Sequence, residues 1–224
     1  DLEAALAENP RDADAAECLA LWYTTSASKA KATLDNAAAA RNSQAALKVM
    51  DDLVAANPGD PSSLALKLGQ DVAAVENLED PGNNPASLVR RKAAALEALR
   101  PRLGEVHRAY MAADPEKLTN LDIARFQVVA VRIDPKDGPA LVGQVNDRAL
   151  TKAPTNADLL ARRAELAYMS GDLEGTIAIL QTIIDLPRRP VSLDGLRLFD
   201  IRRRAIFAQT NAALALALKA PDQA

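Results

Sequence analysis

Apolar residues recur along the chain at helical spacing, in stretches rich in Ala and Leu that short breaks of Pro, Gly, Asn and Asp separate. In four of the breaks, Pro is followed two residues later by Asp or Asn. Proline disfavours helical geometry in the residue before it, and the Asp or Asn side chain can cap the next helix. Each break is therefore predicted to end one helix and begin another. The four are Asn9-Pro10-Arg11-Asp12, Asn57-Pro58-Gly59-Asp60, Asp134-Pro135-Lys136-Asp137 and Ala153-Pro154-Thr155-Asn156.

The pattern predicts helices along the whole chain. Residues 12–40 are also compatible with one long helix, because Thr24, Thr25 and Ser26 weaken a helix without forbidding it. Residues 78–85 are the clearest predicted loop, either a linker or a tight connection between helices. The predicted helices span residues 1–8, 12–25, 27–40, 43–56, 61–77, 85–99, 102–113, 116–133, 138–152, 156–170, 172–186 and 193–219.

Composition strengthens the helical prediction. The 224 residues include 47 Ala, which is the strongest helix former and is depleted in strands, so an all-β fold is excluded. The hydrophobic fraction of 49% is ordinary for a globular chain, which argues against disorder. Aromatic residues make up only 3%, so the core is predicted to depend on Ala and Leu at close contacts between helices.

One segment carries a family resemblance. Residues 157–187 combine a first helix with Leu160, Ala164 and Ala167, a Gly-Asp-Leu turn at residues 171–173, and a second helix with Leu180 and Ile183. This segment resembles a tetratricopeptide repeat, a pair of antiparallel helices that stacks on its neighbours. The departures from the family pattern are Arg163 where Leu is usual, Thr176 where Ala is usual, and Pro187 one place early.

Two further fragments resemble the same repeat more weakly. Residues 27–58 match as a repeat of their own, with a first helix that is nearly all Ala and with Ala46, Met50, Leu53 and Pro58 at second-helix positions. Residues 10–23 resemble the opening of a repeat. The intervals between the breaks are irregular, so the 34-residue period is not sustained. The resemblance implies an all-α fold, a right-handed superhelix of antiparallel helix pairs. Such a divergent TPR-like solenoid is well supported over about a third of the chain and inferred elsewhere.

We expect one continuous solenoid with three parts. Residues 1–80 form acidic N-terminal repeats with 14 acidic and 6 basic residues, residues 81–192 form central repeats that include the unit 157–187, and residues 193–224 form a closing helix and tail. Residues 1–8 resemble the end of a second helix whose first helix is missing. They are therefore expected to leave an apolar edge where a longer solenoid would continue.

Catalytic and ligand-binding motifs are absent from the sequence. There is no Gly-rich phosphate loop, His-Glu-x-x-His or Cys-x-x-Cys, so no enzyme activity, cofactor or metal is expected. His107 is interpreted as a lone structural His rather than a general base, and Cys18 as a small hydrophobic residue among apolar neighbours. The pairs Asp51-Asp52 and Glu79-Asp80 are interpreted as solvated faces and caps. No apolar run is long enough to span a membrane.

Basic residues concentrate near the C-terminal end. The isoelectric point near 5.3 argues against a nucleic-acid partner, so the cluster is either a solvated helix face or a protein contact. In the predicted closing helix, residues 193–219, we expect a buried face of Leu196, Phe199, Ile206 and Leu214. The cluster comprises Arg188, Arg189, Arg197, Arg202, Arg203 and Arg204.

The resemblance implies a non-catalytic scaffold that binds a protein or peptide on a concave surface. In this family that surface comes from first-helix positions, which fall here on Asp158, Ala161, Arg162, Glu165, Tyr168 and Met169. With Arg202, Arg203 and Arg204, these are the candidate partner-binding residues, although ordinary solvated residues would give the same pattern. The alternative function is a structural subunit of a larger assembly, and the third is a helical enzyme domain.

Overall fold

The computed structural model is all-α in the part of the chain that it describes, residues 1–78, 84–187 and 193–219, with no strand there. The side chains of residues 193–197, 199, 218 and 219 are outside this description. The chain divides into two compact units, residues 1–113 with 124–135 and residues 114–123 with 136–224. The all-helical prediction is confirmed. No described helix is both long enough and apolar enough to cross a membrane.

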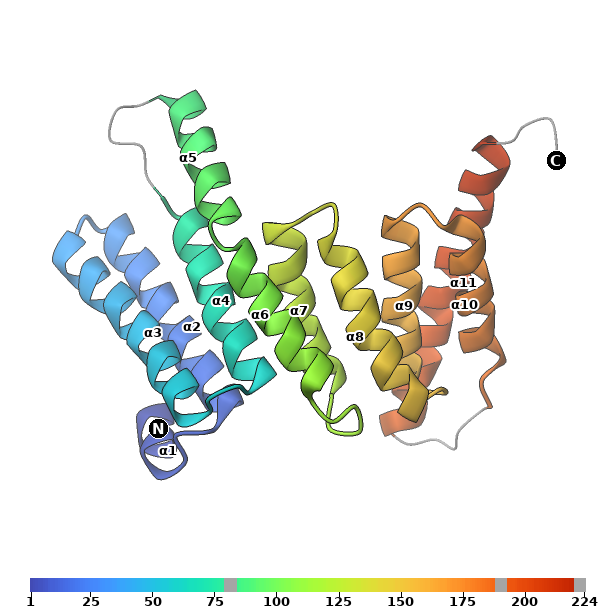
Figure 1. Ribbon diagram of the computed structural model, residues 1–224, viewed down its shortest axis with the longest axis horizontal. Coiled ribbons are helices and arrows are strands. Elements are labelled where there is room, and N and C mark those ends of the chain that lie inside the picture. Colours follow the sequence, from blue (N-terminus) through green and yellow to red (C-terminus); the bar gives the residue numbers. More distant parts are fainter. Residues whose placement is uncertain (79–83, 188–192, 220–224) are drawn as a thin grey trace. The chain divides into compact units, whose positions relative to one another are not determined.

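The first unit contains the N-terminal helices (Figure 1). They are α1 (Leu2–Glu8), α2 (Ala13–Ala32), α3 (Asn36–Ala56), α4 (Pro61–Glu76), α5 (Pro85–Glu97), α6 (Arg100–Ala112) and most of α7 (Asn120–Ile133). The second unit contains the first residues of α7 together with α8 (Gly138–Lys152), α9 (Ala157–Met169), α10 (Leu173–Asp185) and α11 (Leu193–Lys219).

Residues 12–56 form two long helices, and both predictions for this stretch are wrong. The break falls at Thr33 to Asp35. Leu34 adopts a left-handed conformation with φ of 61°, its N–H donates to the Lys31 carbonyl, and the Asp35 N–H donates to the Ala30 carbonyl. These two bonds are a Schellman motif, the usual way to end a helix. A Leu stands where that motif normally has Gly, so the sequence pattern gave no signal of a break.

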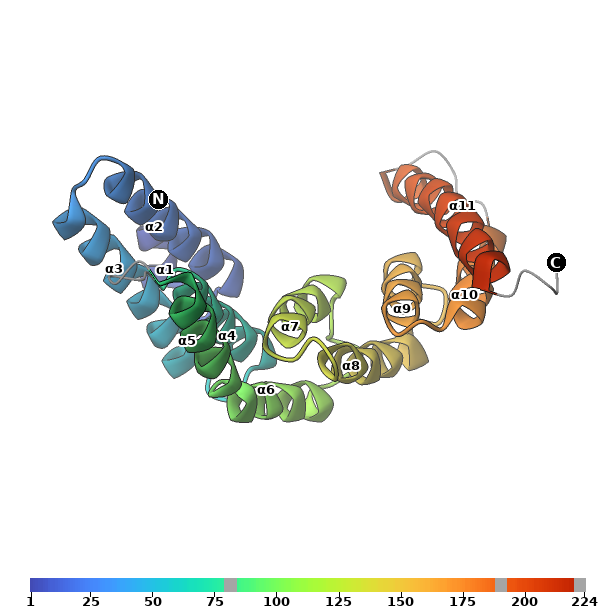
Figure 2. The same cartoon turned by 90° about the horizontal axis from the view of Figure 1, so that it is seen from above.

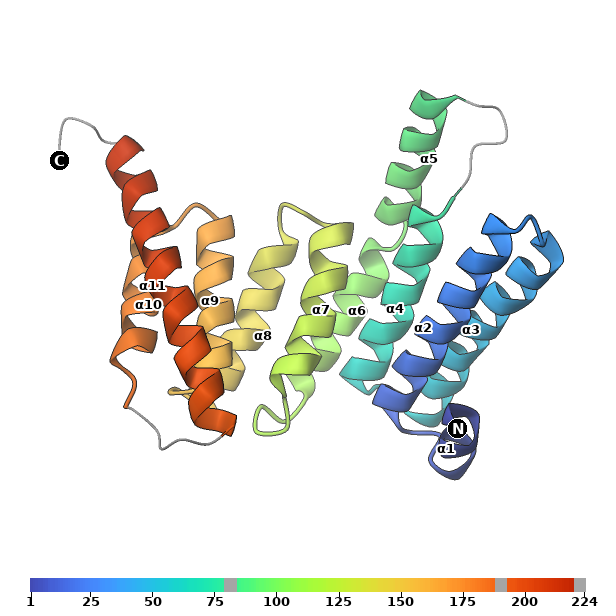
Figure 3. The same cartoon turned by 180° about the vertical axis from the view of Figure 1, so that it is seen from behind.

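The two weaker repeat fragments belong to one helix pair. Ala16 and Ala20 of α2 form a buried cluster with Ala46, Met50 and Leu53 of α3. The two helices lie side by side and run in opposite directions (Figures 1 and 3). The prediction that residues 27–58 form a repeat of their own is therefore wrong. The opening fragment supplies the first helix of the pair, and the later fragment supplies the second.

Helices α5 and α6 are separated only by Ala98 and Leu99. Proline at position 101 cannot donate a backbone hydrogen bond, and its ring would clash with the carbonyl four residues earlier. The break falls two residues before the predicted one at residues 100–101, so that Pro101 lies in the first turn of α6, where its missing N–H costs nothing. The rings of Tyr110 in α6 and Phe126 in α7 lie 5.0 Å apart, and both side chains are fully buried in the core of the first unit.

The segment predicted to resemble a tetratricopeptide repeat forms the helix pair α9 and α10. Gly171 takes φ of 82°, and the N–H groups of Gly171 and Asp172 end α9 with the same two hydrogen bonds that those of Leu34 and Asp35 make at the end of α2. Asp172 then caps α10, and its side chain accepts from the Gly175 N–H at 2.8 Å. The residues predicted to pack between the two helices are all buried: Leu160, Ala164, Ala167, Leu180 and Ile183.

Helix α11 lies alongside α10 (Figures 2 and 3) and has the predicted bounds, but the predicted buried face is wrong. Leu198, Ala205 and Ala212 are buried, at intervals of seven residues, whereas Ile206 and Leu214 are 52% and 60% exposed. The side chains of Leu196 and Phe199 lie outside the described residues. Small Ala residues lie on the packed face because α11 approaches its neighbours closely there.

Candidate functional site

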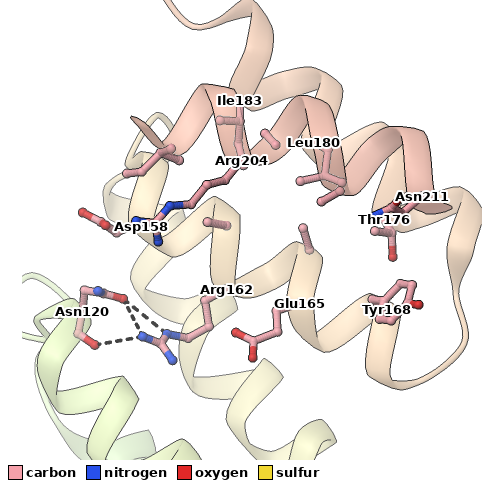
Figure 4. Close-up of a pocket in the computed structure, with 15 residues that line it drawn as sticks. Asn120, Asp158, Arg162, Glu165, Tyr168, Thr176, Leu180, Ile183, Arg204 and Asn211 are labelled. Atoms are coloured by element: carbon pink, nitrogen blue, oxygen red, sulfur yellow. Dashed lines mark hydrogen bonds between the residues drawn. The ribbon is translucent and has the colours of Figure 1, made fainter. Parts of the chain in front are cut away.

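A groove of about 580 Å³ lies on the second unit, between α9 and α11, with α10 as its floor (Figure 4). Its volume is in the range of small-ligand or peptide side-chain pockets, not of a whole domain interface. Its floor is buried and, apart from Thr176, apolar, with polar groups around the rim. The lining residues are Asn120, Asp158, Ala161, Arg162, Ala164, Glu165, Tyr168, Thr176, Leu180, Ile183, Ile201, Arg204, Ala205, Ala208 and Asn211.

The face of α9 that lines the groove follows from helical spacing. Asp158, Ala161, Glu165 and Tyr168 are three or four residues apart and so share one side of the helix. Asn156 starts α9, and its side chain accepts from the Asp158 and Leu159 N–H groups. On α11, the polar residues that line the groove lie on the flank of the helix beside its buried face.

Arg162 is fixed in the groove wall by Asn120, which begins α7. The Arg162 Nη2 donates to the Asn120 side-chain oxygen at 2.9 Å, and Nε donates to the same oxygen at 3.3 Å. Burial lowers the pKa of the Arg162 guanidinium, while the carboxylates of Glu165 and Asp158 act in the opposite direction. Arg162 is thus a positioned cation that already has an acceptor.

Arg204 enters the groove from α11 and is paired within its own helix. Its Nη2 lies 2.6 Å from Asp200, and Arg203 lies 3.0 Å from the other oxygen of the same carboxylate. A hydrogen bond from Arg203 lowers the pKa of Asp200, and the charge of Arg204 acts in the same direction. The three consecutive arginines therefore do not act as one patch. Arg202 is half-buried and donates from Nε to the Ile183 carbonyl at 3.4 Å.

The structure brings together part of the set predicted from sequence. Asp158, Arg162, Glu165 and Tyr168 line the groove with Arg204, and Ala161 lies among them. Met169 is 46% exposed and is not part of the lining, and Arg202 and Arg203 lie outside it. The cluster members Arg188 and Arg189 and the side chain of Arg197 lie outside the described residues.

Sequence reasoning missed three polar groups of the groove. Thr176 was noted only as a departure from the repeat, yet it is buried in the floor and donates to the Asp172 carbonyl at 2.6 Å. Asn211 follows Arg204 by two helical turns. The spacing of Arg204, Ala208 and Asn211 places them on one face of α11, and this spacing could have identified Asn211 from the sequence. Asn120 is 42 residues from Arg162, and no local pattern links the two.

The other candidate residues occupy different positions. His107 stacks on Phe126 with ring centroids 6.1 Å apart in the first unit. Cys18 is exposed, so its interpretation as a packed hydrophobic residue is wrong: it lies on the side of α2 opposite the buried Ala16 and Leu19.

The carboxylate pair Asp51 and Asp52 lies on α3. Each of the two is bonded to a lysine, with Lys67 2.8 Å from Asp51 and Lys48 2.6 Å from Asp52. Glu79 and Asp80 lie outside the described residues. Within the described residues, no group of three or more His, Cys, Asp or Glu side chains is arranged to hold a metal ion.

A second surface feature is the outward face of α11. Ile206, Phe207 and Leu214 are 52%, 68% and 60% exposed, and residues 205–218 contain no charged side chain. Phe207 and Leu214 lie on the side of α11 opposite the buried Ala205 and Ala212, and Ile206 lies at the edge of that side, so α11 carries apolar side chains on both sides. Single exposed apolar residues are ordinary, but a continuous uncharged helix face is typical of a contact surface.

No protein-family model matches the chain, and no curated protein or solved structure is significantly similar to it.

Proposed function

We propose that this chain is a non-catalytic interaction scaffold of the tetratricopeptide-like solenoid type, and that it binds a protein or peptide segment in the groove between α9 and α11. The observation that supports this function is the composition of the groove. First-helix residues that the family resemblance assigns to a binding surface line one cavity with an apolar floor and a charged rim. Interfaces commonly combine an apolar centre with a polar rim.

The proposal requires that helix pairs such as α2 with α3 and α9 with α10 continue as repeat units of one superhelix. In such a protein each pair contacts its neighbours, and the first helices line the inner surface. The half-exposed Tyr168 supplies the kind of side chain that carries binding energy, because Tyr is enriched at interface hot spots.

The test begins with capture of partners from the native source, analysed by mass spectrometry. A true groove partner is captured by the wild type but not by the double variant Arg162→Ala/Tyr168→Ala. Calorimetry with the purified partner should then show a loss of at least about 1 kcal/mol of binding free energy. Met169→Ala, which changes an exposed residue just outside the groove, is the matched control and should bind like the wild type. Equal affinity of the double variant and wild type would rule out the groove as the binding site and with it the proposed function.

A structural subunit of a larger assembly is the second candidate function, and the uncharged outward face of α11 favours it. Burying Phe207 and Leu214 against another subunit would remove this apolar surface from water. Under this function, Phe207→Asp should abolish co-assembly in light-scattering measurements without lowering the melting temperature. Under the groove function, the same substitution leaves partner binding intact.

A further inference from the structure

The charged groups of the groove differ in how far they are already satisfied. Arg162 donates to Asn120, and Arg204 is paired with Asp200. An anionic partner would have to compete with these acceptors for both guanidinium groups. Competition of this kind reduces the gain from a new ion pair, because the existing hydrogen bonds are lost when the new ones form.

Glu165 and Tyr168 offer a surface that is suited to a cation. Glu165 is exposed in the groove lining, and Tyr168 follows it one helical turn later with half of its surface exposed. Figure 4 shows Glu165 between Arg162 and Tyr168, with Asp158 and Arg204 at one end of the groove and Thr176 and Asn211 at the other. A carboxylate beside an aromatic ring attracts a cation through its charge and through the electron-rich face of the ring.

The floor of the groove determines which parts of the partner can lie around that cation. The walls contain small side chains that leave the groove wide, those of Ala161, Ala164, Ala205 and Ala208. Leu180 and Ile183 form an apolar base. The long aliphatic stem of Lys or Arg packs well over such a surface while its charged head reaches a polar group. Small aliphatic side chains of the same segment would fill the remaining volume.

We propose that the groove binds a peptide segment that presents a Lys or Arg side chain to Glu165 and Tyr168 and aliphatic side chains to the floor. This inference rests on the proposed scaffold function and specifies the chemistry of its partner. Arg162 then acts as a positioned wall of the groove, and the contact with the partner's charge is made by Glu165.

The test uses the full chain and two labelled twelve-residue peptides of Ala and Leu, one carrying three Lys and the other three Glu at the same places. Fluorescence anisotropy at low salt should show the Lys peptide binding at least about tenfold more tightly. The preference should shrink as salt screens the charges. Glu165→Lys should reverse the preference, and Glu165→Gln should weaken it. Tyr168→Leu should lower affinity for the Lys peptide, whereas Tyr168→Phe should keep it.

Glu174→Lys is the matched control. It makes the same change of charge on an exposed residue of α10 that does not line the groove, so it reports attraction of the Lys peptide to the whole acidic chain. The inference is supported when Glu165→Lys reverses the preference and Glu174→Lys does not. Circular dichroism of each variant confirms that the fold is retained.

Equal binding of the two peptides, no binding of the Lys peptide, or equal effects of Glu165→Lys and Glu174→Lys would overturn the inference. The scaffold function stands in that case if the native partner still loses affinity for the Arg162→Ala/Tyr168→Ala variant. The scaffold function fails if that variant binds its native partner normally, whatever the peptides do.

Discussion

Arg125 and Arg132 lie on one helix, α7, and both form ion pairs, yet their environments differ. Only 7% of the Arg125 side chain is exposed, and it donates to Asp14 and Glu17 of α2, more than 100 positions earlier in the chain. Burial by itself lowers the pKa of Arg125, but hydrogen bonds and charge from Asp14 and Glu17 outweigh it, so the pKa is raised. Arg132 is 49% exposed and lies 3.2 Å from Glu76.

At the residue scale we therefore expect the two arginines to differ in their contribution to stability. Arg125→Ala removes charge-assisted hydrogen bonds from a buried group and should lower the free energy of unfolding by about 2 kcal/mol. Arg132→Ala, the matched control, removes an exposed pair and should cost about 0.5 kcal/mol. Urea unfolding measures both. Equal losses would mean that the buried contacts of Arg125 contribute no more than a surface pair.

At the scale of the elements, two turns of the same type end α2 and α9. Both use a residue with positive φ and the same pair of backbone hydrogen bonds, but α9 has Gly171 at this position and α2 has Leu34. A left-handed conformation is unfavourable for a residue with a Cβ atom and costs Gly little. Leu34 is 84% exposed, so its side chain gains little from burial in return.

Leu34→Gly should therefore stabilise the chain, by about 0.5–1 kcal/mol after the greater flexibility of Gly in the unfolded state is included. Leu34→Val should destabilise it, because a β-branched residue fits this conformation worst. Thermal or urea unfolding of the two variants should shift in opposite directions. A stabilising effect of Val, or a destabilising effect of Gly, would contradict the assignment of the turn.

At the scale of the whole molecule, each unit has a core of its own. Ala16, Met50 and Leu53 belong to a cluster in the first unit, and Ala205 packs with Leu180 in the second. Stability in helical-repeat architectures is close to a sum of local terms, because each helix pair depends on its immediate neighbours.

Ala205→Asp should therefore unfold the second unit selectively. The substitution buries a charge at a position that is 3% exposed and should cost on the order of 3 kcal/mol. Hydrogen exchange should speed up across α9, α10 and α11, while α2 and α3 keep their protection. Ile206→Asp, one residue later at an exposed position, is the control and should change stability by no more than about 0.5 kcal/mol. Global loss of protection in the Ala205 variant would show that the units unfold together.

The sequence by itself determined the features that short stretches of chain control. The all-helical fold follows from Ala content and helical spacing, and the bounds of α8 and α11 agree with those predicted from the apolar stretches and the breaks between them. The turn at Gly171 was recognisable because Gly is the residue that a left-handed conformation favours. The groove residues that α9 supplies were also predictable, because sequence spacing fixes which positions share one face of a helix.

The tertiary structure decided what depends on contacts between distant residues. Leu34 carries no local signal of a turn, and the pairing of α2 with α3 forms its buried cluster only when residues 16–20 meet residues 46–53. Helix α11 has apolar side chains on two faces, and packing against α10 buries the face with Ala205 and Ala212. Asn120 reaches Arg162 from 42 positions away. Helical spacing says which residues share a face, but the neighbouring element decides which face is buried.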